Sequence, residues 1–290
     1  MTAPLGPGPP RLVDLVRAEV LRALTRRAVR VLLAIALIGT VAFSIITFLV
    51  ADEVDEVEGR RAGPGIPARV VDLWPDPAVT EPNVGQADED VDAILVPAMI
   101  FLFLGALIGG ATVAGAEWES RSIETTLLRE PRRARVVLTK LAVSGALAAV
   151  IGVGLLLAWS AAWLPTPVVK GDTAGVDAPW LRSWFAALVR AGMLAGGCAV
   201  VAGAIATIAR RTVAAFVTVF AVISIGEPIV RGLRPSWQEW MILENLGNVM
   251  LAGAENIMER STLGSFATLT LYLAAVVAVA VVSTTRRDIV

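Results

Sequence analysis

The hydrophobic pattern of this chain consists of long apolar runs separated by polar segments. Each run approaches the ~20 residues that a helix needs to cross the hydrocarbon core of a bilayer. The pattern therefore predicts an all-α integral membrane protein, with a single transmembrane domain over residues 1–290. The six predicted transmembrane helices are Val31–Val50, Ile94–Ala114, Leu141–Leu164, Trp184–Ala209, Thr212–Val230 and Phe266–Val282.

Two further patterns precede the first apolar run. Residues 1–10 are rich in Pro and Gly, which predicts a disordered tail without the features of a signal peptide. Residues 11–30 show helical spacing, with Val16 and Val20 on one arc and Asp14 and Arg22 on the opposite arc. We expect an amphipathic helix that lies among the lipid headgroups, with the arginines at 26, 27 and 30 near its end. The alternative is a solvated helix that only leads into the membrane.

Composition agrees with lipid surroundings. Of the 290 residues, 56% are hydrophobic and 18% are charged, against roughly 45–50% and ~25% in globular domains. The chain has no histidine and one cysteine, Cys198, which excludes an intrachain disulfide, Cys/His metal sites and histidine-dependent catalysis. Cys198 lies among small residues in an apolar run and is interpreted as a packing residue. The net charge of −1 does not indicate a nucleic-acid partner.

The charges are unevenly distributed among the connecting segments. Basic residues gather before the first run and after the second, fourth and sixth, whereas residues 51–93 are acidic. This alternation predicts six spans with both termini in the cytoplasm. The prolines of the outer loop 51–93 exclude a continuous helix, and its carboxylates lack calcium-loop spacing, so no metal site is predicted. Arginine in preference to lysine, with abundant Ala and Val, favours a bacterium with a GC-rich genome as the source, and the expected location is the bacterial inner (cytoplasmic) membrane.

Small and aromatic residues mark expected contacts of the spans. Gly105 and Gly109 form a G-x-x-x-G pair in the second run, and Gly192 and Gly196 recur in the fourth. Small residues allow helices to approach closely in lipid, so we expect contacts here, either within the chain or in a dimer. An aromatic belt is expected at the outer ends of the third and fourth runs, at Trp163, Trp180 and Trp184.

Two charged residues, Arg190 and Glu227, interrupt the fourth and fifth runs. Such charges are often paired or line a wet path, so both are candidates for a transport path or gate. Alternatively, Arg190 extends to the outer headgroups and Glu227 only marks a helix end. Gly226 and Pro228 flank Glu227 and predict a break there. The outer segment 231–265 is expected to form short re-entrant or interfacial helices, divided near Gly253.

A densely charged segment, residues 115–140, separates the second and third runs on the predicted cytoplasmic side. We expect a helix from Trp118 to Arg129, ended by Pro131, with an apolar centre and charges on both flanks. Such a helix is suited to dock in a groove of a partner protein, whereas the alternative is an ordinary solvated loop. The candidate coupling residues are Glu117, Glu119, Arg121, Glu124, Leu127, Leu128, Arg129, Arg132, Arg133 and Arg135.

This segment resembles the first cytoplasmic loop of type-two ABC exporter permeases. The resemblance extends to the order of elements along the chain, and its local motifs are Glu117, Thr126–Leu127–Leu128, Pro131–Arg132–Arg133 and Lys140. It implies a pathway formed with a second permease, which is another copy of this chain or a homologous permease. It also implies two copies of a separate ABC ATPase subunit. Closure of the ATPases would push on the docking helix and open an outer gate around residues 227–251.

The chain contains no G-x-x-x-x-G-K-[ST] phosphate loop, so it is not expected to be an enzyme by itself. The resemblance places ATP and Mg²⁺ on the partner ATPase, with no cofactor in this chain. The expected function is therefore the membrane permease subunit of an ATP-driven exporter. One alternative is a stand-alone ion-coupled transporter, with Glu227 as its coupling carboxylate. A membrane-embedded enzyme that uses the outer carboxylates is another.

Overall fold

The computed structural model describes residues 12–50, 70–74, 95–120, 122–123, 132–170, 173, 175–251 and 260–286. This part of the chain is helical and contains no strand. Six of its helices are long and apolar enough to cross a membrane, which confirms the predicted all-α, multi-pass membrane protein. The candidate spans are Arg27–Leu49, Leu95–Glu119, Arg133–Lys170, Ala178–Ala209, Thr212–Leu233 and Thr262–Arg286.

The helices extend beyond the apolar runs because their charged or polar flanks are helical as well. Helix α5 (Arg133–Trp163) begins eight residues before the third run and continues into the short α6 (Pro165–Lys170). Helix α7 (Ala178–Ala209) begins at Asp177, whose side chain accepts the backbone N–H of Trp180 at 2.8 Å. This N-cap and the proline in the first turn fix the helix start.

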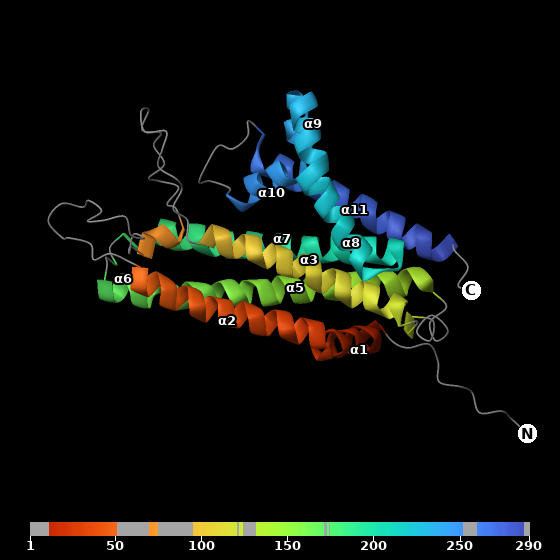
Figure 1. The fold of residues 1–290 in the computed structure, drawn as a ribbon, viewed down its shortest axis with the longest axis horizontal. Helices are drawn as coiled ribbons and strands as arrows, with labels where there is room; N and C mark the ends of the chain where they lie inside the picture. Colours follow the sequence, from red (N-terminus) through yellow and green to blue (C-terminus); the bar gives the residue numbers. More distant parts are fainter. Residues whose placement is uncertain are drawn as a thin grey trace, which may run out of the picture.

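Helix α7 is the central helix of the bundle (Figure 1). In the most apolar 18-residue stretch of α7, 61% of the residues are buried. The share is 11% in the corresponding stretches of α2 (Arg27–Val50) and of Thr212–Leu233. Helices α3 (Leu95–Glu119) and α5 both pack along α7, and α11 (Thr262–Arg286) also contacts α7 and α5. Helix α2 lies beside α5, and α1 (Leu12–Thr25) packs against α5 near the start of α2.

The closest helix contacts are made by glycines. A Cβ on Gly110 of α3 would lie 2.6 Å from Cα of Ala199 in α7, and a Cβ on Gly196 would lie 2.9 Å from the carbonyl oxygen of Gly145 in α5. The small residues of the second and fourth runs therefore bring three helices together. By contrast, a Cβ on Gly105 or Gly109 would have no atom within 4 Å, so the G-x-x-x-G pair makes no such contact within the described chain.

Gly110 and Gly109 provide a matched pair for testing this packing. Gly110→Ala is expected to destabilise the fold by about 1–3 kcal/mol or more, because the new methyl meets backbone that moves only with the whole helix. Gly109→Ala is expected to be neutral or slightly stabilising, since its methyl enters open space and alanine favours a helix. The thermal unfolding midpoints of both variants in the same detergent check the difference. Equal midpoints would contradict the close approach of α3 and α7.

The fifth span does not break at Glu227 as the flanking Gly and Pro predicted. Helix α8 (Thr212–Ala221) continues through a π-helical segment, η2 (Val222–Gly226), into α9 (Glu227–Leu233). The backbone N–H of Glu227 donates to the carbonyl oxygen of Val222, five residues earlier. This wider turn accommodates Pro228, which has no N–H and would obstruct a regular α-helical ladder. The α8–α9 helix rises away from the layer of α3, α5 and α7 in Figure 1.

Two short helices follow α9 and are separated at Met241, whereas the predicted division near Gly253 lies outside the described residues. The 3₁₀ helix η3 (Pro235–Trp240) ends at Met241, where the backbone is extended, and α10 (Ile242–Met250) begins. Asn248 of α10 donates to Ser265 Oγ at 2.8 Å, which attaches α10 to the start of α11. The re-entrant or interfacial position of these helices remains a prediction.

The tryptophans near the ends of α5 and α7 form a buried core rather than an open aromatic belt. Trp163 and Trp180 are 0% and 3% exposed, and Trp184 is half-buried. The reason is that residues 70–74, which include the helix η1 (Val70–Leu73), cover them with Trp74. Trp180 Nε1 donates to the carbonyl oxygen of Trp74 at 2.8 Å, and Trp74 Nε1 donates to Ser183 Oγ at 3.1 Å.

Candidate functional site

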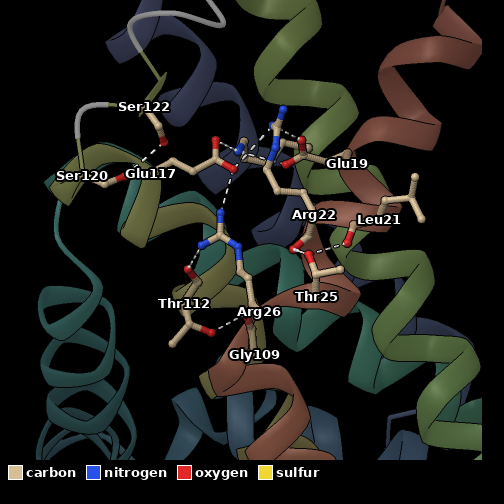
Figure 2. Close-up of polar contacts among 11 residues, drawn as sticks. Glu19, Leu21, Arg22, Thr25, Arg26, Gly109, Thr112, Glu117, Ser120 and Ser122 are labelled. Atoms are coloured by element: carbon tan, nitrogen blue, oxygen red, sulfur yellow. Dashed lines mark hydrogen bonds and ion pairs between the residues drawn. The ribbon is translucent and has the colours of Figure 1, made fainter.

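A cluster of charged side chains joins α1 to the last turn of α3 and the first turns of α5 (Figure 2). We call it the ionic cluster: Glu19 and Arg22 of α1, Arg26 between α1 and α2, Glu117 of α3, and Lys140 of α5. Glu117 lies in the last turn of α3, just before residues 120–132, and Lys140 lies two turns into α5, just after them. The cluster therefore connects the two ends of the charged segment.

Lys140 is the centre of the ionic cluster. Its Nζ donates to Glu117 Oε2 and lies 2.9 Å from Glu19 Oε1 as an ion pair. All three residues are buried, with 5% of Lys140, 3% of Glu117 and 7% of Glu19 exposed. A charge removed from water to this extent is stable only when its partners are held in place.

The two arginines complete the pairing of the carboxylates. Arg26 donates to Glu117 Oε1 at 2.7 Å and to the carbonyl oxygen of Thr112 at 2.9 Å. Arg22 pairs with Glu19 Oε2 at 2.8 Å and lies 3.6 Å from Glu117 Oε1. Every oxygen of the two buried carboxylates thus has a cationic partner. With three cations and two carboxylates, the cluster carries a formal charge of +1.

Helix periodicity explains how α1 contributes to this cluster. Glu19 and Ala23, four residues apart, are the buried positions of α1, which packs against α5. The apolar positions Leu12, Val13 and Val16 are exposed on α1 instead. The helix therefore directs a carboxylate toward the bundle and leaves its apolar arc uncovered. This orientation differs from that of a helix in a soluble protein, which buries its apolar arc.

A second contact joins the end of α3 to the start of α8. Glu119 Oε1 accepts the backbone N–H of Thr212 at 2.8 Å, so a carboxylate satisfies a free donor at the first turn of α8. Arg210, in the left-handed conformation with φ 57°, ends α7 and lies over the Trp118 ring at 4.9 Å. Through these contacts the turn between α7 and α8 is attached next to the ionic cluster.

The structure places only part of the predicted coupling segment. Trp118 and Glu119 belong to α3, and Ile123 is buried against Val136 and Trp118. Arg133 and Arg135 lie in the first turn of α5, and Arg132 precedes it. The remaining predicted residues lie outside the described part of the chain, so the docking helix stays a prediction: Arg121, Glu124, Leu127, Leu128 and Arg129.

The structure uses Arg190 and Glu227 separately. Glu227 is 8% exposed, and its two carboxylate oxygens accept the backbone N–H groups of Ile242 and Leu243. It therefore caps α10 and fixes this helix to α9. The Arg190 guanidinium lies 6.0 Å from the centroid of the Trp74 ring, and its Nε and Nη2 have no hydrogen-bond partner among the described residues. A pairing of the two residues is not seen.

Four members of the ionic cluster were not among the candidate coupling residues: Glu19, Arg22, Arg26 and Lys140, the last of which appeared only among the motifs of the resemblance. The available signal was Glu19, the only acidic residue between Arg17 and Val50. A single carboxylate within a basic stretch next to a span indicates a specific partner, because Glu is costly to bury alone. Its partner Lys140 is far along the chain and becomes apparent only after α1 is packed on α5.

No protein-family model, curated protein or solved structure matches this chain. Among the described residues, no group of three His, Cys, Asp or Glu side chains is placed to hold a metal ion. Support for a function therefore comes from the residues of this chain and their geometry.

Proposed function

We propose that this protein is the membrane permease subunit of an ABC exporter, driven by a separate ATPase subunit that docks on residues 115–140. The charged, partly apolar sequence of this segment supports docking to a partner. ATP and Mg²⁺ belong to that partner, two copies of which would serve a pair of permeases. The partner of this chain in the pair is a second copy or a homologous permease.

The observation that carries the proposal is the attachment of the segment at both ends. Glu117 near its start and Lys140 at its end meet in the ionic cluster, together with α1 and Arg26, the residue before α2. Glu119 adds the start of α8. A force applied to the segment would therefore reach α2, α3 and α5 through the ionic cluster, and α8 through the exposed contact between Glu119 and Thr212. An ordinary solvated loop would not need ionic attachment at both of its ends.

The exposed parts of the molecule are compatible with this role. Large apolar side chains are uncovered on α2 and α8, for example Ile38 at 68% and Phe220 at 66% exposed. Such faces suit lipid or a second permease. The exposed apolar arc of α1 suits the headgroup region of the membrane leaflet that lies beside the ionic cluster. In the proposed topology that leaflet is the cytoplasmic one of the bacterial inner membrane, with both termini in the cytoplasm.

The proposal predicts ATP hydrolysis that depends on two proteins. The chain, purified under mild conditions from the membranes of its own cell, is expected to retain a nucleotide-binding subunit. Hydrolysis by the pair is expected to exceed that of either protein alone, because the permease couples its conformations to the ATPase. Hydrolysis by the separated ATPase at the full rate would contradict coupling. Function that survives ATP depletion and collapses with an uncoupler would favour the ion-coupled alternative.

A further inference from the structure

A long apolar groove of about 720 Å³ lies between α2, α3 and α5. The described residues that line it are uncharged, and they are apolar apart from the hydroxyl groups of Thr40 and Ser144 and the indole of Trp159. Ile35 of α2 and Phe101 of α3 line the groove and are largely exposed, so it opens sideways between these helices. Because α2 and α3 are candidate spans, the groove opens toward the hydrocarbon core of the membrane.

Three glycines deepen this groove. A Cβ built on Gly39, Gly105 or Gly109 would have no atom within 4 Å, and all three residues line the groove. Glycine is less favourable than alanine inside a helix, so its presence there calls for a reason. At Gly110 the reason is the close approach of Ala199, but no such contact within the described chain explains the other three. Their contribution is the space that they leave open.

The dimensions of the groove fit an extended chain and are too narrow for a helix. Along α3 its lining extends from Ala98 to Val113, which corresponds to a rise of about 22 Å at 1.5 Å per residue. A volume of 720 Å³ over this length gives a mean cross-section of about 33 Å², or a width of about 6 Å. A helix with its side chains is roughly 10–12 Å across, whereas the carbon atoms of a hydrocarbon chain pack about 4 Å from their neighbours. The groove therefore admits a hydrocarbon chain and not a helix of a second copy.

The lining also limits which part of an amphiphile can enter the groove. A buried phosphate or ammonium group is stable only beside charged or hydrogen-bonding partners, and the described lining supplies no charge. A headgroup would therefore stay outside, at the membrane surface, while the hydrocarbon lies in the groove. Contacts with the hydrocarbon alone do not discriminate between anionic and zwitterionic headgroups.

We propose that the groove binds one acyl chain of a membrane phospholipid and does not select its headgroup. The acyl chain would pack between α2 and α3 along the middle of both helices. Arg26 joins α3 at one end of this stretch, and Phe43 stacks on Trp159 of α5 at the other, with ring centroids 4.0 Å apart. Between these two attachments, the bound acyl chain would supply van der Waals contacts that connect α2 with α3. The lipid site does not depend on coupling to an ATPase.

The first test compares headgroups at constant chain length. The purified protein is delipidated and titrated, in one detergent, with phosphatidylglycerol or phosphatidylcholine that have the same acyl chains, and native mass spectrometry counts the retained lipids. We expect one tightly retained lipid of either kind, with affinities within about twofold of each other. Lipids with the same headgroups and much shorter chains are expected to bind roughly tenfold more weakly, because they fill less of the groove. A preference of about tenfold for one headgroup, or no dependence on chain length, would overturn the proposal.

A second set of variants locates the retained lipid. Gly105→Leu and Gly109→Leu each place a side chain in the groove, and each is expected to lower the affinity for both lipids by about tenfold. Gly154→Leu is the matched control, because a Cβ there also meets open space but Gly154 is exposed on α5 outside the groove. Equal lipid retention by the three variants would contradict binding in the groove. Conversion of a dimer to a monomer by Gly109→Leu, with lipid retention unchanged, would assign the groove to a second copy of the chain instead.

Discussion

Replacement of Lys140 by methionine is expected to destabilise the folded chain by about 3–5 kcal/mol. Methionine preserves much of the length of the side chain and removes its charge. Glu117 Oε2 and Glu19 Oε1 would then lose their cationic partner at buried positions. The desolvation cost of both carboxylates remains, whereas the attraction that offset it is gone. Thermal unfolding of the purified variant in mild detergent measures the effect.

Two comparisons separate charge from side-chain size in this experiment. Arg17→Met removes a cation from an exposed position of α1 and is expected to change the midpoint little. Adding Glu19→Gln to Lys140→Met is expected to restore part of the stability, since one buried charge disappears with its lost partner. A Lys140→Met variant as stable as the unsubstituted chain would show that the ionic cluster does not hold α1, α3 and α5 together.

Sequence pattern was sufficient for the spans because their signal is local. An apolar run such as Leu141–Leu164 is long enough to cross a bilayer, and the helix α5 covers most of it regardless of its neighbours. The signals that determine the helix ends lie outside the apolar runs. Asp177 and Pro179 begin α7 well before its apolar run, and the sequence reasoning did not use this capping signal.

The candidate site was harder to predict because its members are distant in sequence. Arg26 and Glu117 are separated by 91 positions, and only the packing of α1 and α3 brings them together. Glu227 presents a different difficulty. Its flanking Gly and Pro indicate a break in any α-helix, but a π-helical turn keeps the helix continuous and its carboxylate caps α10. Neither the turn nor the cap has a pattern in the neighbouring residues.

Replacement of Arg26 by glutamine is expected to weaken the coupling between the docking segment and α2. Arg26 is the direct link from the residue before α2 to Glu117 and to the carbonyl oxygen of Thr112. Glutamine retains an N–H donor. It lacks the positive charge of a guanidinium and its ability to donate to Glu117 and to Thr112 at the same time. Glu117 keeps Lys140 as its partner, so the fold is expected to persist. The expected loss of coupling is about 0.5–2 kcal/mol, or roughly 2- to 30-fold in the coupled rate.

The most direct test of the account is the rate at which the chain stimulates ATP hydrolysis by its partner ATPase, compared between Arg26→Gln and Arg17→Gln. Both variants must first be shown to fold and to retain the ATPase in equal amounts. Coupling through the ionic cluster predicts that Arg17→Gln stimulates hydrolysis like the unsubstituted chain, while Arg26→Gln binds the ATPase and stimulates it poorly. Full stimulation by Arg26→Gln, or an unsubstituted chain that stimulates no ATPase, would contradict the proposed coupling through the ionic cluster.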